Sequence, residues 1–311
     1  MKQIFPALLM ASLGVIAACG DSQADVQRAA HAQEVMEWRE WRLEQLLKPT
    51  GFLTQVGLYW IGDGRYSIGS AAGSDIRLPA TAAAHVGDIA LTDQGPLLTV
   101  ADGVDVVTAA DDGSPLAVTE LLMLPDSSGE IVMATLGSIA WSVVERGGKL
   151  AVRVRDFEHP WVDTFGPLPY YEINPKWRVD ATLHRYDEPR VITVNTVIEG
   201  FQQNPTSPGV VRFEVDGAEY ELEPQLVGER LFFVFGDQTN RGETYGAGRY
   251  LYAEVEPDSD QVVLDFNKSY SPPCAFNDFS TCPIASPRNR LDVRIDAGEK
   301  YDEGLHYAGE S

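Results

Sequence analysis

Along most of the chain, apolar and polar residues alternate in short runs that are separated by Gly, Asp and Pro. Examples are the runs 66–68, 97–100 and 139–144. Alternation with a period of two, bounded by turn-forming residues, is typical of half-buried β-strands. The pair Gly147-Gly148 divides two such runs and predicts a hairpin between them. We therefore expect a mainly β protein.

One segment has helical spacing instead. Val35, Trp38, Arg42 and Leu46 follow one another at intervals of three and four residues. Pro49 and Gly51 come directly afterwards and supply a stop signal. The sequence therefore predicts one helix over residues 32–48. Because this helix carries tryptophan, we expect it to pack against the rest of the protein.

The β runs fall into two series. The Pro-rich and aromatic stretch 165–171 separates them, and a second series of runs extends from Trp177 to Phe266. Many short strands at regular spacing suggest β-sandwich or barrel-like units. We expect an N-terminal β domain at 50–166, a C-terminal β domain at 170–301 and a short tail at 302–311.

The first residues have the pattern of an export signal. Lys2 precedes an apolar run from Ile4 to Ala18, which is shorter than the roughly 20 residues of a membrane-spanning helix. The sequence Ile16-Ala17-Ala18-Cys19 resembles the lipobox of bacterial lipoproteins. That resemblance implies cleavage after residue 18, lipid attachment at Cys19 and a flexible tether over 19–31. Gly20 favours the outer membrane, facing the periplasm. An ordinary cleaved signal with an accidental cysteine is the alternative.

The composition limits the partners of the folded part. The chain of 311 residues carries 46 Asp and Glu against 24 Lys and Arg, for a formal net charge of −22. A nucleic acid would be repelled by this charge, so we expect no nucleic-acid partner. A solvated acidic surface that keeps the protein soluble explains the charge without any partner.

Two cysteines remain if Cys19 receives lipid. Cys274 and Cys282 are an even pair in an oxidising compartment, which favours a disulfide. Free thiols, and a metal or catalytic role, stay open as alternatives. The five histidines have no metal-ligand spacing, and we expect no metal and no cofactor.

The N-terminal β runs resemble the opening of a forkhead-associated sandwich. The resemblance rests on Tyr66–Gly69, Ser74–Pro79, His85 and Ile89. That family holds phosphothreonine with an arginine directly after the glycine, and Ser70 stands in this position here. The resemblance therefore implies the sandwich fold and not the phosphate site.

Polar residues are densest between Phe235 and Lys300. The segments 235–239, 244–250, 264–276, 281–283, 289–291 and 297–300 resemble the bacterial family called domain of unknown function 1684. The resemblance supplies no activity. Ser269 and Ser271 depart from it, because the family more often has Ala and Asn there. Family members without an export signal keep the cysteine pair, which puts an exclusively disulfide role in doubt.

The same region supplies the candidate binding residues, which are charged, amide or hydroxyl side chains in predicted loops. They are Asp237, Thr239, Thr244, Tyr245, Arg249, Asp265, Asn267, Tyr270, Asn289, Arg290, Glu299 and Lys300. Such a set can form a pocket for a small anionic or sugar-like ligand, with arginine as the anchor. It can equally be a structural network that satisfies buried loop backbone.

Two hypotheses about function follow. In the first, a non-enzymatic envelope lipoprotein binds a small molecule or a partner through the C-terminal β domain. In the second, a hydrolase-like enzyme uses Asp237 or Asp265 with Tyr245 or Arg249. The chain contains no G-x-S-x-G, no H-E-x-x-H and no P-loop, so the first hypothesis is favoured and the catalytic residues are unknown.

Overall fold

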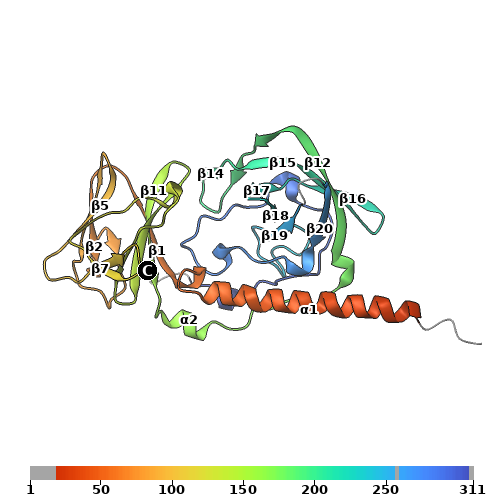
Figure 1. Ribbon diagram of the computed structural model, residues 1–311, viewed down its shortest axis with the longest axis horizontal. Helices are drawn as coiled ribbons and strands as arrows, with labels where there is room; N and C mark the ends of the chain where they lie inside the picture. Colours follow the sequence, from red (N-terminus) through yellow and green to blue (C-terminus); the bar gives the residue numbers. More distant parts are fainter. Residues whose placement is uncertain (1–18, 256–258, 308–311) are drawn as a thin grey trace, which may run out of the picture.

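The computed structural model describes residues 19–255 and 259–307 of the chain. A long helix and two β bodies make up the fold, with the helix running along the C-terminal body (Figure 1). This agrees with the prediction of a mainly β chain with one N-terminal helix. None of the described helices combines the length and the apolar character that crossing a membrane requires.

The helix α1 spans Cys19–Leu47. It begins well before residue 32 and includes the segment 19–31, for which a flexible tether was predicted. The physical reason is local: no Gly or Pro interrupts residues 21–48, and Ala, Gln and Arg are frequent there. The side of α1 that carries Val35 and Leu46 is buried, as its spacing predicted.

Two sheets build the N-terminal body. The first has the order β1-β11-β10-β9-β6-β7, and the second has the order β3-β2-β4-β5-β8. Their strands are β1 (Gln55–Ile61), β2 (Arg65–Gly69), β3 (Ile76–Arg77), β4 (Gly87–Thr92), β5 (Gly95–Val100), β6 (Val107–Ala109), β7 (Pro115–Ala117), β8 (Glu120–Leu122), β9 (Met133–Leu136), β10 (Ile139–Arg146) and β11 (Lys149–Asp156). Both sheets contribute to one apolar core around Ile68, Ile89, Leu98 and Trp141, so they pack as a sandwich.

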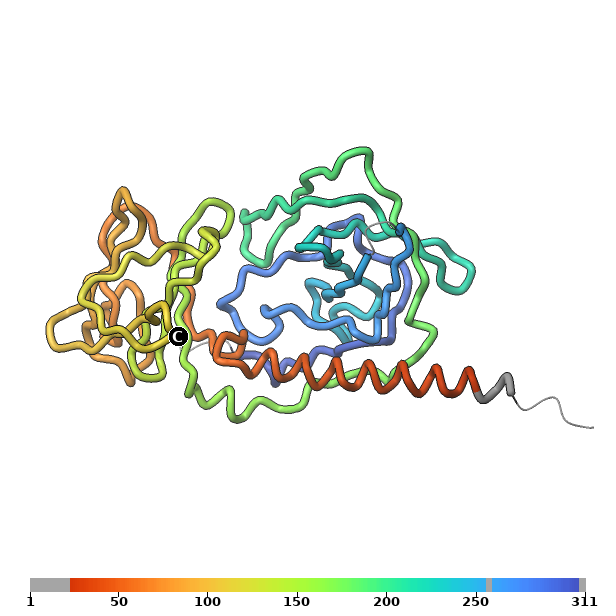
Figure 2. The backbone as a smooth tube through the Cα atoms, in the orientation of Figure 1, coloured from red at the N-terminus to blue at the C-terminus, as the bar shows by residue number. Residues whose placement is uncertain are grey.

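The predicted hairpin joins β10 to β11. Arg146 pairs with Lys149, so Gly147 and Gly148 form a two-residue loop. Their φ angles are 56° and 76°, which glycine adopts without a steric penalty. From β11 the chain continues through α2 (Pro160–Thr164) and runs beside α1 to the C-terminal body (Figure 2).

The C-terminal body contains a four-stranded sheet, a three-stranded sheet and a two-stranded ribbon. The orders are β16-β15-β12-β20, β17-β18-β19 and β13-β14. The strands are β12 (Arg178–Val191), β13 (Val194–Asn195), β14 (Gln202–Gln203), β15 (Thr206–Val215), β16 (Ala218–Leu222), β17 (Gln225–Val227), β18 (Arg230–Phe235), β19 (Arg249–Glu254) and β20 (Gln261–Asp265). Trp177, Phe213, Phe233, Phe235 and Phe266 fill the core between the larger sheets.

Candidate functional site

Part of the predicted cluster is a closed internal network. The side chains of Asp237 and Arg249 are fully buried and form an ion pair. Arg249 also donates to the main-chain oxygens of Ile295, at 2.9 Å, and Ala297. Asp237 accepts from the backbone NH of Thr239 at 2.6 Å. A buried charge pair with these partners fixes the loops together, and neither side chain is exposed to a ligand.

Other candidates belong to the same network or form hydrogen bonds that hold a second loop in place. The hydroxyl oxygens of Thr239 and Thr244 lie 2.8 Å apart inside it. Asn289 donates to the carbonyls of Glu223, at 2.9 Å, and Val234, at 3.1 Å, and it accepts from the NH of Glu223. Thr239 and Thr244 therefore hold one loop in shape, and Asn289 joins its loop to strand β18.

Three of the remaining candidates lie at the edge of the cluster. Tyr245 packs edge-on against Tyr301, with ring centroids 5.3 Å apart, and burial raises its pKa. The Lys300 ammonium lies 5.0 Å from the ring centroid of Tyr171. Arg290 is exposed. The structure does not bring these side chains to one concave surface.

The other candidates lie under α1, and here the helix supplies residues that sequence reasoning missed. His31 Nε2 lies 2.8 Å from Asp265 Oδ2, and both side chains are about nine-tenths buried. Asp265 Oδ1 accepts from the amide and the side chain of Asn267, at 3.2 and 3.0 Å. Asn267 in turn exchanges bonds with the backbone of Asn174. His31 lies four residues before Val35, and this spacing was the signal in the sequence that both residues lie on the same side of a helix.

Further along the same face of α1, Arg42 reaches Glu299 and Tyr270. Its Nε lies 3.6 Å from Glu299 Oε2, and its guanidinium carbon lies 4.5 Å from the Tyr270 ring centroid. Trp38 packs against Tyr270 with centroids 6.1 Å apart. The seam between α1 and the C-terminal body is therefore polar and aromatic, and not mainly aliphatic.

Glu299 is a carboxylate of this seam whose pKa is shifted by burial. It is fully buried, and burial raises its pKa above the ordinary value of 4.5, although Arg42 and the NH of Ser271 oppose the rise. The folded protein therefore holds this proton to a higher pH than the unfolded chain does. The resulting stabilisation is complete below pH 4.5 and is lost as the pH rises through the folded-state pKa.

We predict that Glu299→Gln flattens the pH dependence of stability. The free energy of unfolding of the wild type should fall more steeply from about pH 4.5 upward than that of the variant. Urea unfolding at several pH values measures both slopes. Glu243→Gln is the control, because Arg294 lowers the pKa of the Glu243 carboxylate. Glu243 therefore contributes stability that is lost as the pH falls, which is the opposite dependence to that of Glu299. Parallel curves for the wild type and Glu299→Gln would contradict the prediction.

Cys274 and Cys282 form a disulfide. The favoured prediction for this pair is thus confirmed over free thiols. The two cysteines are buried with Phe232, Val234 and Tyr250. The bond closes the loop that follows the 3-10 turn Pro273–Ala275. No three His, Cys, Asp or Glu side chains share a geometry suited to a metal ion within residues 19–255 and 259–307.

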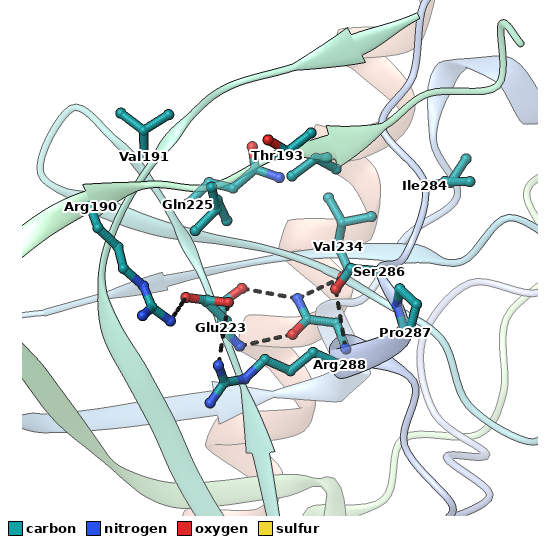
Figure 3. A pocket seen from close by; sticks show the side chains of 13 residues that line it. Arg190, Val191, Thr193, Glu223, Gln225, Val234, Ile284, Ser286, Pro287 and Arg288 are labelled. Carbon is teal, nitrogen blue, oxygen red and sulfur yellow. Dashed lines mark hydrogen bonds and ion pairs between the residues drawn. The ribbon is translucent and has the colours of Figure 1, made fainter. Parts of the chain in front are cut away.

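An open cavity of about 510 Å³ lies on another side of the C-terminal body, where sequence reasoning placed only Asn289 (Figure 3). Six of its lining residues are apolar: Val191, Ile192, Val194, Val234, Ile284 and Pro287. Its charged residues are Arg190, Glu223 and Arg288. Because β12, the β16–β17 connection and the 284–289 loop each contribute, only the tertiary structure assembles it.

Two arginines share one carboxylate in this cavity. Arg190 Nη2 lies 3.0 Å from Glu223 Oε1, and Arg288 Nη1 lies 3.8 Å from Glu223 Oε2. The Arg190 and Arg288 side chains are 50% and 41% exposed, whereas that of Glu223 is 12% exposed. Tyr186 donates to the same carboxylate at 2.6 Å. Arg190 is thus held by Glu223, and Arg288 is held mainly by Glu221, whose Oε1 lies 2.8 Å from Arg288 Nη2. Both guanidinium groups keep N–H donors free for solvent or a ligand.

The fold and the site define a mainly β protein whose C-terminal domain is covered by a helix and contains an arginine-lined cavity. Residues 163–300 match the family described as "Protein of unknown function (DUF1684)", and this part of the chain belongs to that family. The match confirms the resemblance drawn from the sequence. The family description names no activity.

One similar solved structure is the solution NMR structure of an uncharacterized protein of Haloarcula marismortui. Its sequence is 32% identical to this chain, and the alignment covers 45% of this chain and 79% of that protein. The TM-score is 0.37. A search of curated proteins found no match.

Proposed function

We propose that this chain is a lipid-anchored protein of the bacterial cell envelope that binds a small amphiphilic anion in the cavity of Figure 3. The observation that carries the proposal is the lining of this cavity. Two partly exposed guanidinium groups adjoin Glu223, and six apolar residues complete the wall. A ligand with a carboxylate or phosphate group and an apolar body matches both parts.

The charge of the cavity favours an anion over a cation. Arg190 and Arg288 outnumber Glu223, although the whole chain has a formal net charge of −22. A cationic ligand would have to displace an arginine from Glu223, whereas an anionic one can use the remaining guanidinium donors. The 510 Å³ volume is within the usual range for small-molecule sites.

The proposed location rests on the sequence before Cys19. A lipid on this residue holds the chain on the outer membrane, where it faces the periplasm, and the acidic surface fits a solvated body beside the membrane. Nucleic acid is not among the proposed partners. The alternative of a hydrolase-like enzyme has less support, because Asp237 and Arg249 bind each other in the interior.

Isothermal titration with octanoate and octyl phosphate tests the binding proposal. The wild type should bind both, and octylammonium, which has the same chain length and the opposite charge, should not bind. Replacing both Arg190 and Arg288 with Gln should raise the Kd at least about 10-fold, because each charge-assisted bond contributes roughly 1.5–3 kcal/mol.

A matched surface variant separates the cavity from general charge effects. Arg185 pairs with Asp260 at 2.7 Å, shares no partner with Arg190 or Arg288, and does not line the cavity. Arg185→Gln should leave the Kd unchanged. If neither anion binds the wild type, or if the double variant binds them as the wild type does, the proposal is wrong.

A further inference from the structure

The end of the Arg42 side chain is enclosed by residues of the C-terminal domain. Arg42 Nη2 donates to the carbonyl of Ser271 at 3.0 Å, and Nε lies 3.6 Å from Glu299 Oε2. The guanidinium carbon lies 4.5 Å from the ring centroid of Tyr270 and 5.9 Å from that of Phe276. One carbonyl, one carboxylate and two aromatic rings thus surround a single guanidinium group.

This set of groups is the one that recognises guanidinium in proteins. A carboxylate gives charge-assisted hydrogen bonds, and an aromatic face attracts the planar cation. Glu299 is fully buried and Phe276 is 3% exposed, so water competes little for these contacts. We call the pocket formed by Tyr270, Ser271, Phe276 and Glu299 the guanidinium pocket. None of its four residues lines the cavity of Figure 3.

The fit of Arg42 to this pocket is incomplete. Arg42 Nε, Glu299 Oε2 and the Ser271 hydroxyl are buried and have no hydrogen-bond partner. The distance of 3.6 Å between the first two atoms is too long for a hydrogen bond. Tyr170, whose ring lies next to Arg39, also has a buried hydroxyl without a partner. The pocket therefore offers hydrogen-bonding capacity that the side chain of α1 does not use.

The incomplete fit extends along the whole seam. Eleven buried side-chain polar atoms of the described residues lack a partner, and six of them belong to the seam. The six are His31 Nδ1, Arg39 Nε, Arg42 Nε, Tyr170 OH, Ser271 Oγ and Glu299 Oε2. Unpartnered buried groups oppose the docking of α1, so a ligand that satisfies them has an advantage over the helix.

We propose that the guanidinium pocket is a binding site for guanidinium groups and that Arg42 of α1 occupies it as an internal ligand. Its natural competitor is the arginine side chain of another polypeptide or a small free guanidinium compound. This site is separate from the anion cavity, and the two proposals stand or fall independently.

Chemical rescue of Arg42→Ala tests the proposal in the full chain. The substitution removes the internal ligand and opens the pocket through the channel of the Arg42 side chain, which is 7% exposed in the wild type. Methylguanidinium at about ten times its Kd should raise the Tm of this variant by about 2–4 °C. Methylammonium at the same concentration should not, and neither compound should raise the Tm of the wild type.

A second substitution identifies the pocket. Glu299→Gln in the Arg42→Ala background should abolish the rescue, whereas Arg28→Ala in that background should preserve it, because Arg28 lies on an exposed part of α1. Arg42→Gln replaces Arg42→Ala if the alanine variant shows no cooperative unfolding. Equal shifts with methylguanidinium and methylammonium, or a rescue that survives Glu299→Gln, would overturn the proposal.

The same assay distinguishes the two sources of the ligand. N-acetylarginine amide represents an arginine residue within a chain, and agmatine represents a free guanidinium compound. A larger Tm shift with the first supports a polypeptide partner, and a larger shift with the second supports a free compound. Absence of a shift with all three guanidinium compounds would overturn the proposal.

Discussion

Arg249→Ala is expected to lower the free energy of unfolding by about 3–5 kcal/mol, because it leaves a buried carboxylate without its partner. The Asp237 side chain is fully buried. The carbonyls of Ile295 and Ala297 lose their donor in the same substitution. Urea unfolding followed by tryptophan fluorescence measures the change.

A double-substitution cycle shows whether the pair itself causes this loss. Asp237→Ala alone should also be strongly destabilising, and Asp237→Ala with Arg249→Ala should cost less than the sum of the two single substitutions. Arg212→Ala, at an exposed pair, should change the unfolding free energy little. If Arg249→Ala also has little effect, the ion pair of Asp237 and Arg249 does not stabilise the fold.

Cys19→Ser is expected to move the protein from the membrane fraction to the soluble fraction of the cell envelope. A serine hydroxyl does not replace the thiol in lipid attachment, and no helix among the described residues is long and apolar enough to cross a membrane. Labelling with radioactive palmitate, followed by fractionation, measures both the lipid and the location. Label should be present in the wild type and absent from the variant.

The other two cysteines provide the control for this experiment. Replacing both Cys274 and Cys282 with Ser removes the disulfide and leaves the proposed anchor intact. This variant should keep the label and stay with the membrane. A wild type that carries no label would contradict lipid attachment at Cys19.

Much of the fold could be predicted from local patterns. The run 139–144 appears as β10, and the Gly147-Gly148 turn appears as the hairpin loop, because both depend on neighbouring residues. The expected half-burial of this run was wrong, since all six residues are buried. The helical spacing of Val35 and Leu46 likewise identified the buried side of α1. The helix α1 is longer than predicted, because Ala, Gln and Arg within residues 19–31 favour a helix although the segment also contains small polar residues.

The candidate site was predicted less well. Asp237 follows the end of β18 and Arg249 begins β19, and polar residues at such strand ends serve ligands and structural networks alike. Their burial, which decides between the two roles, depends on strands β18 and β19 and on the chain near Ile295. His31 and Arg42 were missed as site residues because their partners lie more than 200 positions away.

The β character, the long N-terminal helix, the cysteine pair and the family of residues 163–300 follow from the amino-acid sequence alone, whereas the short helix α2 was not predicted. Those properties depend on local spacing or on long matching segments. Only the tertiary structure decided that the predicted cluster divides into an internal brace and a polar seam, and that Arg190, Glu223 and Arg288 share a cavity. The physical reason is that burial and ion pairing are set by chain segments that meet only in the folded protein.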